Sequence, residues 1–199
     1  MQMPHGARAK FRALDEATPE DWQIVLAAEA ADRQRRSIGD RLLALLGSMQ
    51  NDDSLGSPIN LYEHSLQTAT RVMRAGEDDE LVVVALFHDL AEALSDNHHG
   101  LMAAELLSPW ISERRTWLLV HHVEFQRVHF ANHPNQDAHA RDRYIGHPYF
   151  AETAYFCEFY DQNSFDPDFP TMSLTEFAPI VRRFFARPCP PMRPSPPQP

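Results

Sequence analysis

Histidine and aspartate residues recur through the middle hundred positions of this chain, and both residue types are ligands for divalent metal ions. The adjacent pair His88 and Asp89 is the most informative, because it lies inside an apolar run. Isolated histidine and aspartate are rarely placed in a core unless something pairs with them, and a metal ion supplies that partner. The other candidates are His64, the pair His98 and His99, the pair His121 and His122, and Asp161.

The number of candidate ligands bears on how many metal ions the site holds. One metal with open coordination positions needs about three protein ligands, and two metals need about six. One histidine from each pair, together with the remaining candidates, gives four histidines and two aspartates. Asp89 is suited to bridge two metals, because a carboxylate has two oxygen atoms. The pattern therefore predicts a dinuclear site that can activate a water or leave a position open for dioxygen or a chelating substrate.

Helix start and stop signals run through the chain and predict an all-α fold. Thr18-Pro19 followed by acidic residues opens one helix, Asn60 can cap another, and Ser173 with Glu176 forms a capping box. No alternating strand pattern with hairpin signals is present. We expect helices over residues 19–36, 40–49, 61–75, 78–94, 100–107, 109–126 and 177–186, with a loop over 50–58.

The apolar run Leu81–Phe87 is the ambiguous element of this pattern. Because it is apolar all round, its composition also allows a buried strand. The acidic residues that precede it and the continuation over residues 90–94 favour a buried helix that carries His88 and Asp89.

Length and terminal composition predict a single domain. A chain of 199 residues is long enough for one substantial core, which we place at residues 17–187. Residues 1–16 are expected to be flexible, and the proline-rich residues 188–199 are expected to form a disordered tail.

Charge and hydropathy argue against several classes of partner. The net charge is −10 and Lys10 is the only lysine, so a nucleic-acid partner is not expected. The longest apolar run is too short to span a bilayer, and the N-terminus has no signal-peptide pattern. Two cysteines do not suggest a disulfide framework. We expect a cytoplasmic protein; its oligomeric state is left open.

Five segments that carry these residues together resemble the HD-domain superfamily, which is named for its His-Asp pair. The resemblance covers roughly residues 60–165 and extends more weakly to the C-terminal helix. The five segments together are specific evidence for this resemblance, whereas any one of them alone would be weak evidence. The matching segments are Tyr62–Ala69, Ala85–Leu90, His99–Leu106, His122–Gln126 and Tyr160–Asn163.

Within that superfamily, the pattern is closest to the mixed-valent di-iron oxygenases, which include myo-inositol oxygenase and enzymes acting on 2-aminoethylphosphonate-type compounds. The resemblance implies a single HD-domain helical bundle around an Fe(II)/Fe(III) pair bridged by Asp89. It also selects His99 over His98 and His122 over His121. The implied metal ligands are His64, His88, Asp89, His99, His122 and Asp161.

The same resemblance implies oxidation of a small polar molecule by dioxygen, with His88 and Asp89 at the catalytic centre. A hydroxyl of the substrate would bind one iron. Manganese, cobalt and other divalent metals accept the same ligands and are alternatives to iron. Candidate substrate-binding residues are Gln67, Glu92, Gln126, His98 and His121.

Two departures from the phosphonate-oxidising enzymes bear on the substrate. Those enzymes have a lysine shortly after the fourth histidine ligand, where this chain has Gln126. They also have a tyrosine and a glutamate on the loop before the first histidine, and the loop Asn51–Pro58 has neither. We therefore expect a neutral polyol or a cationic amine rather than a phosphonate.

Metal-dependent phosphohydrolysis of a phosphate ester or nucleotide is the alternative activity within the superfamily. Such a site needs cations to hold phosphate, and Arg71, Arg74 and Arg127 could supply them. Arg71 and Arg74 also fit a solvated helix face. The Gly-Tyr-Pro signature of cyclic-dinucleotide phosphodiesterases is absent. A binding or regulatory module is a third interpretation, and the complete ligand set argues against it.

Overall fold

The computed structural model describes residues 7–35, 37–54, 56–95, 98–130 and 132–187. Over these residues the chain forms eight α-helices and no β-strand, which confirms the predicted all-α fold. The helices are α1 (Pro19–Arg35), α2 (Ile38–Ser48), α3 (Leu61–Arg74), α4 (Asp79–Phe87), α5 (His99–Leu107), α6 (Glu113–Gln126), α7 (Phe150–Phe156) and α8 (Leu174–Phe184).

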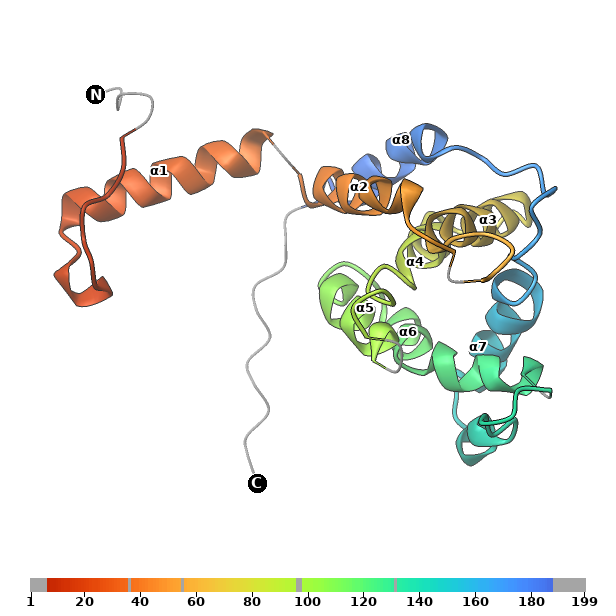
Figure 1. Cartoon of the computed structure of the whole chain (residues 1–199). Coiled ribbons are helices and arrows are strands. Elements are labelled where there is room, and N and C mark those ends of the chain that lie inside the picture. Colours follow the sequence, from red (N-terminus) through yellow and green to blue (C-terminus); the bar gives the residue numbers. More distant parts are fainter. Residues whose placement is uncertain (1–6, 36, 55, 96–97, 131, 188–199) are drawn as a thin grey trace.

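Helix α4 lies at the centre of the core. Every residue of its apolar stretch Leu81–Phe87 is at most 3% exposed, which explains why that stretch has no polar face. Helices α3 and α8 pack against α4, and α2 packs against α8 (Figure 1). On the other side of the core, α5 packs against α6, and α6 packs against α7. The apolar stretch is therefore a buried helix and not a buried strand.

Side-chain caps begin the helices where the sequence predicts them. Asn60 Oδ1 accepts a hydrogen bond from Glu63 N at 2.9 Å, and Glu63 Oε2 accepts one from Asn60 N at 3.3 Å. Asp78 caps α4 through Leu81 N at 2.8 Å. Because α3 and α4 both begin at such caps, the register of both helices along the chain is well defined.

Helix α4 ends at Phe87, seven residues earlier than the expected end at residue 94. The carbonyl of Ala85, which a continuing helix would offer to residue 89, lies 2.8 Å from Nδ1 of His88. Residues 88–94 instead form turns in which Glu92 N donates to Asp89 O at 2.9 Å. Successive residues on an α-helix point about 100° apart. The early end of the helix therefore lets His88 and Asp89 face the same point.

Two further elements differ from expectation. Helix α6 begins at Glu113 rather than near Pro109, because residues 108–110 form a turn and Ser112 is the N-cap residue. Helix α7 was not predicted, since its N-cap residue Tyr149 makes no side-chain cap bond and gives no capping signal. Both segments contribute to the core, through Ile111 before α6 and Phe156 at the end of α7.

Helix α1 stands apart from the other helices in Figure 1. None of its side chains over residues 19–32 is buried. Within the expected flexible N-terminus, Leu14–Glu16 form a 3₁₀ turn and Lys10 N donates to Asp21 at 2.8 Å. Residues 1–6 and the expected tail at 188–199 lie outside the described residues, and the domain limits remain predictions. Among the helices described, none is long and apolar enough to cross a membrane.

Candidate metal centre

The six predicted ligands converge from five parts of the fold. His64 lies on α3, His88 and Asp89 follow the end of α4, and His99 begins α5. His122 lies on α6, and Asp161 ends the π-helical turn η5 (Cys157–Asp161). All six residues are buried. Their ligand atoms form two groups, each compact enough to hold a metal ion.

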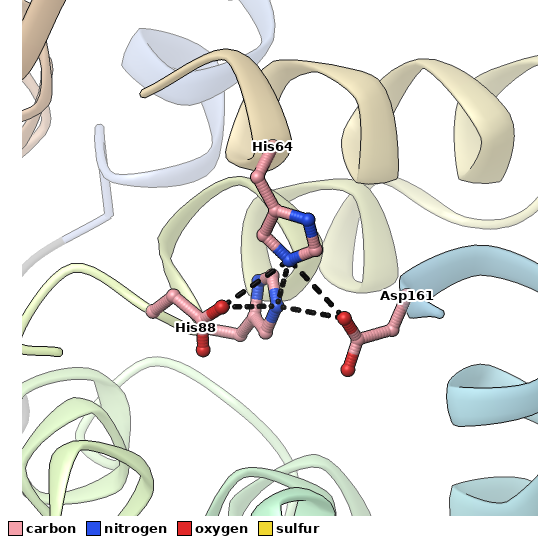
Figure 2. Close-up of side chains that lie close together, drawn as sticks. His64, His88 and Asp161 are labelled. Atoms are coloured by element: carbon pink, nitrogen blue, oxygen red, sulfur yellow. Dashed lines mark hydrogen bonds and ion pairs between the residues drawn. The ribbon is translucent and has the colours of Figure 1, made fainter. Parts of the chain in front are cut away.

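The first group contains His64, His88, Asp89 and Asp161. His64 Nε2 lies 3.2 Å from Asp89 Oδ2 and 3.1 Å from Asp161 Oδ1. His88 Nε2 lies 3.1 Å and 3.5 Å from the same two oxygens. Figure 2 shows the His64 and His88 rings and the Asp161 carboxylate pointing toward one another from three different segments. We refer to these residues as the four-ligand group.

The second group contains Asp89, His99 and His122 and is called the three-ligand group. Asp89 Oδ1 lies 3.2 Å from His99 Nε2 and 3.1 Å from His122 Nε2. The two imidazole nitrogens are 3.1 Å apart. Asp89 therefore belongs to both groups, with Oδ2 facing one and Oδ1 facing the other, which is the arrangement of a bridging carboxylate.

Main-chain carbonyls orient three of the four imidazoles. His64 Nδ1 lies 2.9 Å from Ser164 O, His88 Nδ1 lies 2.8 Å from Ala85 O, and His122 Nδ1 lies 2.8 Å from Leu119 O. A carbonyl oxygen can only accept a hydrogen bond, so each of these Nδ1 atoms carries the proton. In the neutral form of each ring, Nε2 then keeps a lone pair directed into the site, as a metal-ligating histidine requires.

This donor set fits bound cations. When both rings are neutral, the Nε2 lone pairs of His64 and His88 face each other across 3.2 Å, close to two carboxylates. Such an arrangement is repulsive unless a positive charge lies between the atoms. Asp161 Oδ2 is also buried and has no hydrogen-bond partner within the described part of the chain. Ligand atoms bound at about 2.1 Å to one metal lie roughly 3 Å apart, which matches these separations.

The close approach of these imidazoles and carboxylates also shifts their pKa values. Burial opposes protonation of His64, but hydrogen bonds to Asp161 and Asp89 outweigh burial and raise its pKa to about 9. Burial also opposes protonation of His88, whose pKa is nevertheless raised well above its ordinary value by the charge of the same carboxylates. Burial opposes ionisation of Asp89, yet the charge of His88 lowers its pKa well below the usual range. Without metal, protons therefore supply the positive charge at this site.

A π-helical turn positions the last ligand. Gln162 N donates to Cys157 O at 3.1 Å, the wide hydrogen bond that defines a π-turn. Ser164 Oγ donates to Tyr160 O at 2.6 Å, and Ser164 N donates to Asp161 O at 2.9 Å. The chain thus turns directly after Asp161 and presents the Ser164 carbonyl to His64.

A cavity of about 650 Å³ opens onto the site. Five of the six ligands line it, and His88 is the exception. Glu92 and Gln126, which were predicted as substrate-binding residues, also line it. Burial raises the pKa of Glu92 to about 7, with a further contribution from the charge of Asp89. Gln126 is 8% exposed, and its Oε1 has no hydrogen-bond partner in the described structure.

Three predicted substrate-binding residues do not line the cavity. Gln67 donates to Asp166 O at 2.7 Å, so its amide is used within the fold. His98 is exposed at the start of α5. His121 packs against Trp117 and Tyr144, with ring centroids 4.3 Å and 4.5 Å away. Adjacent residues of a helix point in different directions, so only one histidine of each pair reaches the site.

Other cavity-lining residues were not predicted. Asp52 and Asp53 come from the loop after α2, which was interpreted only as a connection. Phe165 lies against His64, with ring centroids 4.5 Å apart, and Phe130 lines the cavity beyond α6. The polar composition of the loop and single exposed aromatics carry no signal that separates a cavity wall from an ordinary surface.

Only one of the three candidate phosphate-binding arginines lines the cavity, namely Arg127. Arg71 donates to Asn163 O at 2.7 Å, and its guanidinium lies 3.9 Å from the centre of the Phe169 ring. Arg74 also lies over Phe169, at 5.1 Å from the ring centre. These two arginines hold residues 163–170 against α3.

Comparison with known proteins gives a distant similarity. No family model matches this chain. The chain is 30% identical over 95 residues to the [1-hydroxy-2-(trimethylamino)ethyl]phosphonate dioxygenase (glycine-betaine-forming) of Leisingera caerulea. The match covers 42% of this chain and 48% of that protein, so the chain spans about half the length of the curated relative. The chain thus combines a distant similarity to a dioxygenase with a buried His/Asp cluster of the kind that holds metal ions.

Proposed function

We propose that this protein is a dinuclear metalloenzyme of the HD-domain type, which oxidises a small hydroxylated or amino substrate with dioxygen. The observation that carries the proposal is the position of Asp89, which faces two pairs of histidines, one with each carboxylate oxygen. The distant similarity to a dioxygenase supports an oxidative reaction. An iron pair, when bound, would supply the redox chemistry that dioxygen requires.

The two groups suit different tasks. In the four-ligand group, His64, His88, Asp89 and Asp161 would hold one metal firmly. The three-ligand group offers one protein ligand fewer and so leaves more coordination positions for a substrate hydroxyl. All three of its residues line the cavity, whereas His88 of the other group does not. We assign His88 and Asp89 to the catalytic centre and residues 17–187 to its domain.

The charges of the cavity wall favour a cationic or neutral substrate over an anionic one. Glu92, Asp52 and Asp53 line it besides the metal ligands, and Arg127 is the single cation among the described lining residues. The relative's name specifies a hydroxyl, a trimethylamino group and a phosphonate on its substrate. For this chain we propose an amino alcohol or a polyol. Glu92 would face an ammonium group, and the unpaired Oε1 of Gln126 would accept a hydrogen bond from the substrate.

Phosphohydrolysis has less support. A phosphate ester carries two negative charges, and besides the metal ions only Arg127 offers a positive charge among the described lining residues. The contacts of Arg71 and Arg74 with residues 163–170 occupy the other two candidate cations. The comparison gives a dioxygenase and not a hydrolase.

Electron paramagnetic resonance tests the proposal directly. The protein is loaded anaerobically with Fe(II), partly oxidised, and examined for the signal of an antiferromagnetically coupled Fe(II)/Fe(III) pair. We expect this signal in the wild type and its loss in Asp89→Asn, which keeps the size of the side chain but not its charge. The signal should shift when an amino alcohol or a polyol that binds the iron is added.

A different result would overturn the proposal. Absence of a coupled signal, combined with Mn(II)- or Co(II)-dependent cleavage of phosphate esters, would identify a phosphohydrolase instead. In that case Arg127 would become the first residue to substitute.

A further inference from the structure

Helices α5 and α6 approach each other closely at Gly100. A Cβ atom built at this position would overlap the carbonyl oxygen of Leu119. It would also lie 2.9 Å from Cε1 and 3.1 Å from Nδ1 of the His122 ring. Cβ atoms in proteins essentially never lie within 3.0 Å of a non-bonded heavy atom, so any side chain at residue 100 would force α5 away from α6.

Gly100 approaches two groups of the proposed metal centre, the Leu119 carbonyl and the His122 ring. His122 is a ligand of the three-ligand group, and the Leu119 carbonyl accepts the hydrogen bond from His122 Nδ1 at 2.8 Å. His99, the residue before Gly100, is the other histidine of this group. The spacing of α5 and α6 therefore sets the distance of 3.1 Å between the two Nε2 atoms.

We infer that Gly100 is a positioning residue of the three-ligand group: its missing side chain lets α5 approach α6 until His99 and His122 can bind the same metal ion. The inference rests on the proposed dinuclear site and adds a residue that itself provides no ligand. The four-ligand group receives no residue from α5 or α6, so it should not depend on Gly100.

Gly47 provides a matched control within the same protein. It also lies inside a helix, and a Cβ built there would meet only Leu174 Cδ2, at 3.4 Å, which is an ordinary contact. Replacing glycine by alanine inside a helix normally favours the folded state, because glycine loses more backbone entropy on folding. Gly47→Ala should therefore leave the protein folded and its metal content unchanged.

The experiment counts metal ions in the wild type, Gly100→Ala and Gly47→Ala, using cobalt titration and elemental analysis. We expect two equivalents in the wild type and in Gly47→Ala. In Gly100→Ala the second equivalent should bind at least ~10-fold more weakly, as for other groups that orient metal ligands, while the first is retained. Circular dichroism should give the same helix content for all three proteins.

The outcomes separate this inference from the proposed function. Two equivalents bound to Gly100→Ala with wild-type affinity would overturn the role of Gly100 and leave the dinuclear site intact. A wild type that binds fewer than two equivalents would overturn the proposed site itself. Two equivalents with no oxidation of any substrate would count against the oxygenase and leave the role of Gly100 standing.

A double substitution covers the case in which Gly100→Ala does not fold. His122→Ala removes the ring and should by itself lose the second metal. If Gly100 acts on the position of this ring, the double variant should bind metal as His122→Ala does, with no additional loss. A double variant that is also unfolded would show that Gly100 serves helix packing alone and would overturn the inference.

Discussion

Gln67 and Asp166 are joined by two hydrogen bonds, although 99 residues separate them in the sequence. Gln67 Nε2 donates to the carbonyl of Asp166 at 2.7 Å, and Gln67 Oε1 accepts from its main-chain N–H at 3.3 Å. Two residues earlier, the Ser164 carbonyl orients the His64 ring. Gln67 thus holds the segment that fixes a metal ligand and makes no contact with the cavity.

Gln67→Met tests this role, because methionine preserves the volume of the side chain but forms neither hydrogen bond. We expect the free energy of unfolding to fall by about 1–3 kcal/mol, the usual effect of two lost hydrogen bonds. Urea denaturation measures it, and Gln23→Met on the exposed face of α1 serves as the control. An unchanged midpoint for Gln67→Met would show that the two hydrogen bonds contribute nothing to stability.

Substitution of the two aspartates should have unequal effects on metal content. Asp89 faces both groups, so Asp89→Ala should remove both metal ions together with activity, while helix content is largely preserved. His88→Ala should also abolish activity and weaken the four-ligand group. Asp161 belongs only to the four-ligand group, so Asp161→Ala should leave the other group able to bind metal. Elemental analysis measures the metal content of each variant. Two equivalents of metal in Asp89→Ala would contradict a bridging position for Asp89.

Metal affinity should rise with pH between about 6.5 and 9. The pKa of His64 in the metal-free protein is raised from 6.5 to about 9, so near neutral pH a metal ion must displace its proton. Displacement of one proton should raise the metal affinity by up to ~10-fold for each unit of pH in this window. The increase should level off above pH 9. Competition with a chelator at several pH values measures the slope.

The metal-free protein should show the opposite trend in stability. Because the pKa of His64 is raised on folding, its contribution to stability is fully present below pH 6.5 and is lost as the pH rises through 9. Urea denaturation of the metal-free protein at pH 6 and pH 9 tests this. For the metal-affinity prediction above, an affinity that does not change with pH would mean that the metal ion displaces no proton from His64.

Glu92→Gln should change substrate preference without removing the metals. If Glu92 faces an ammonium group, the loss of its charge should lower kcat/KM for an amino alcohol by roughly 10- to 100-fold. The value for a neutral polyol should change little. Oxygen consumption with both substrates gives the ratio, and Glu105→Gln on the exposed side of α5 is the control. An equal loss for both substrates would assign Glu92 to the metal site and not to charge recognition.

That these six residues lie together could be predicted because the segments that carry them jointly resemble one superfamily, although each segment alone is a weak signal. His88 and Asp89 follow an apolar stretch, and the paired histidines reduce each further choice to two positions. The caps at Asn60 and Asp78 are likewise local, since a cap depends on residues only three positions apart. Local signals of this kind depend little on the rest of the fold.

Other parts of the site depend on contacts that the sequence does not express. The π-turn that ends at Asp161 has no compositional signature. The roles of Gln67 and His121 are decided by which distant segment each meets, namely Asp166 and the ring of Tyr144. The chain also gives no local sign that Gly100 lies against the Leu119 carbonyl.

The order of the ligands along the chain has a consequence for how the protein is made. During synthesis Asp89, His99 and His122 are added to the chain before Asp161 and Ser164. All residues of the three-ligand group are therefore present in the chain at a stage when the four-ligand group still lacks a carboxylate and the carbonyl that orients His64. A metal ion captured during translation would enter the cavity-facing position first, and the second could follow only when the C-terminal third had folded.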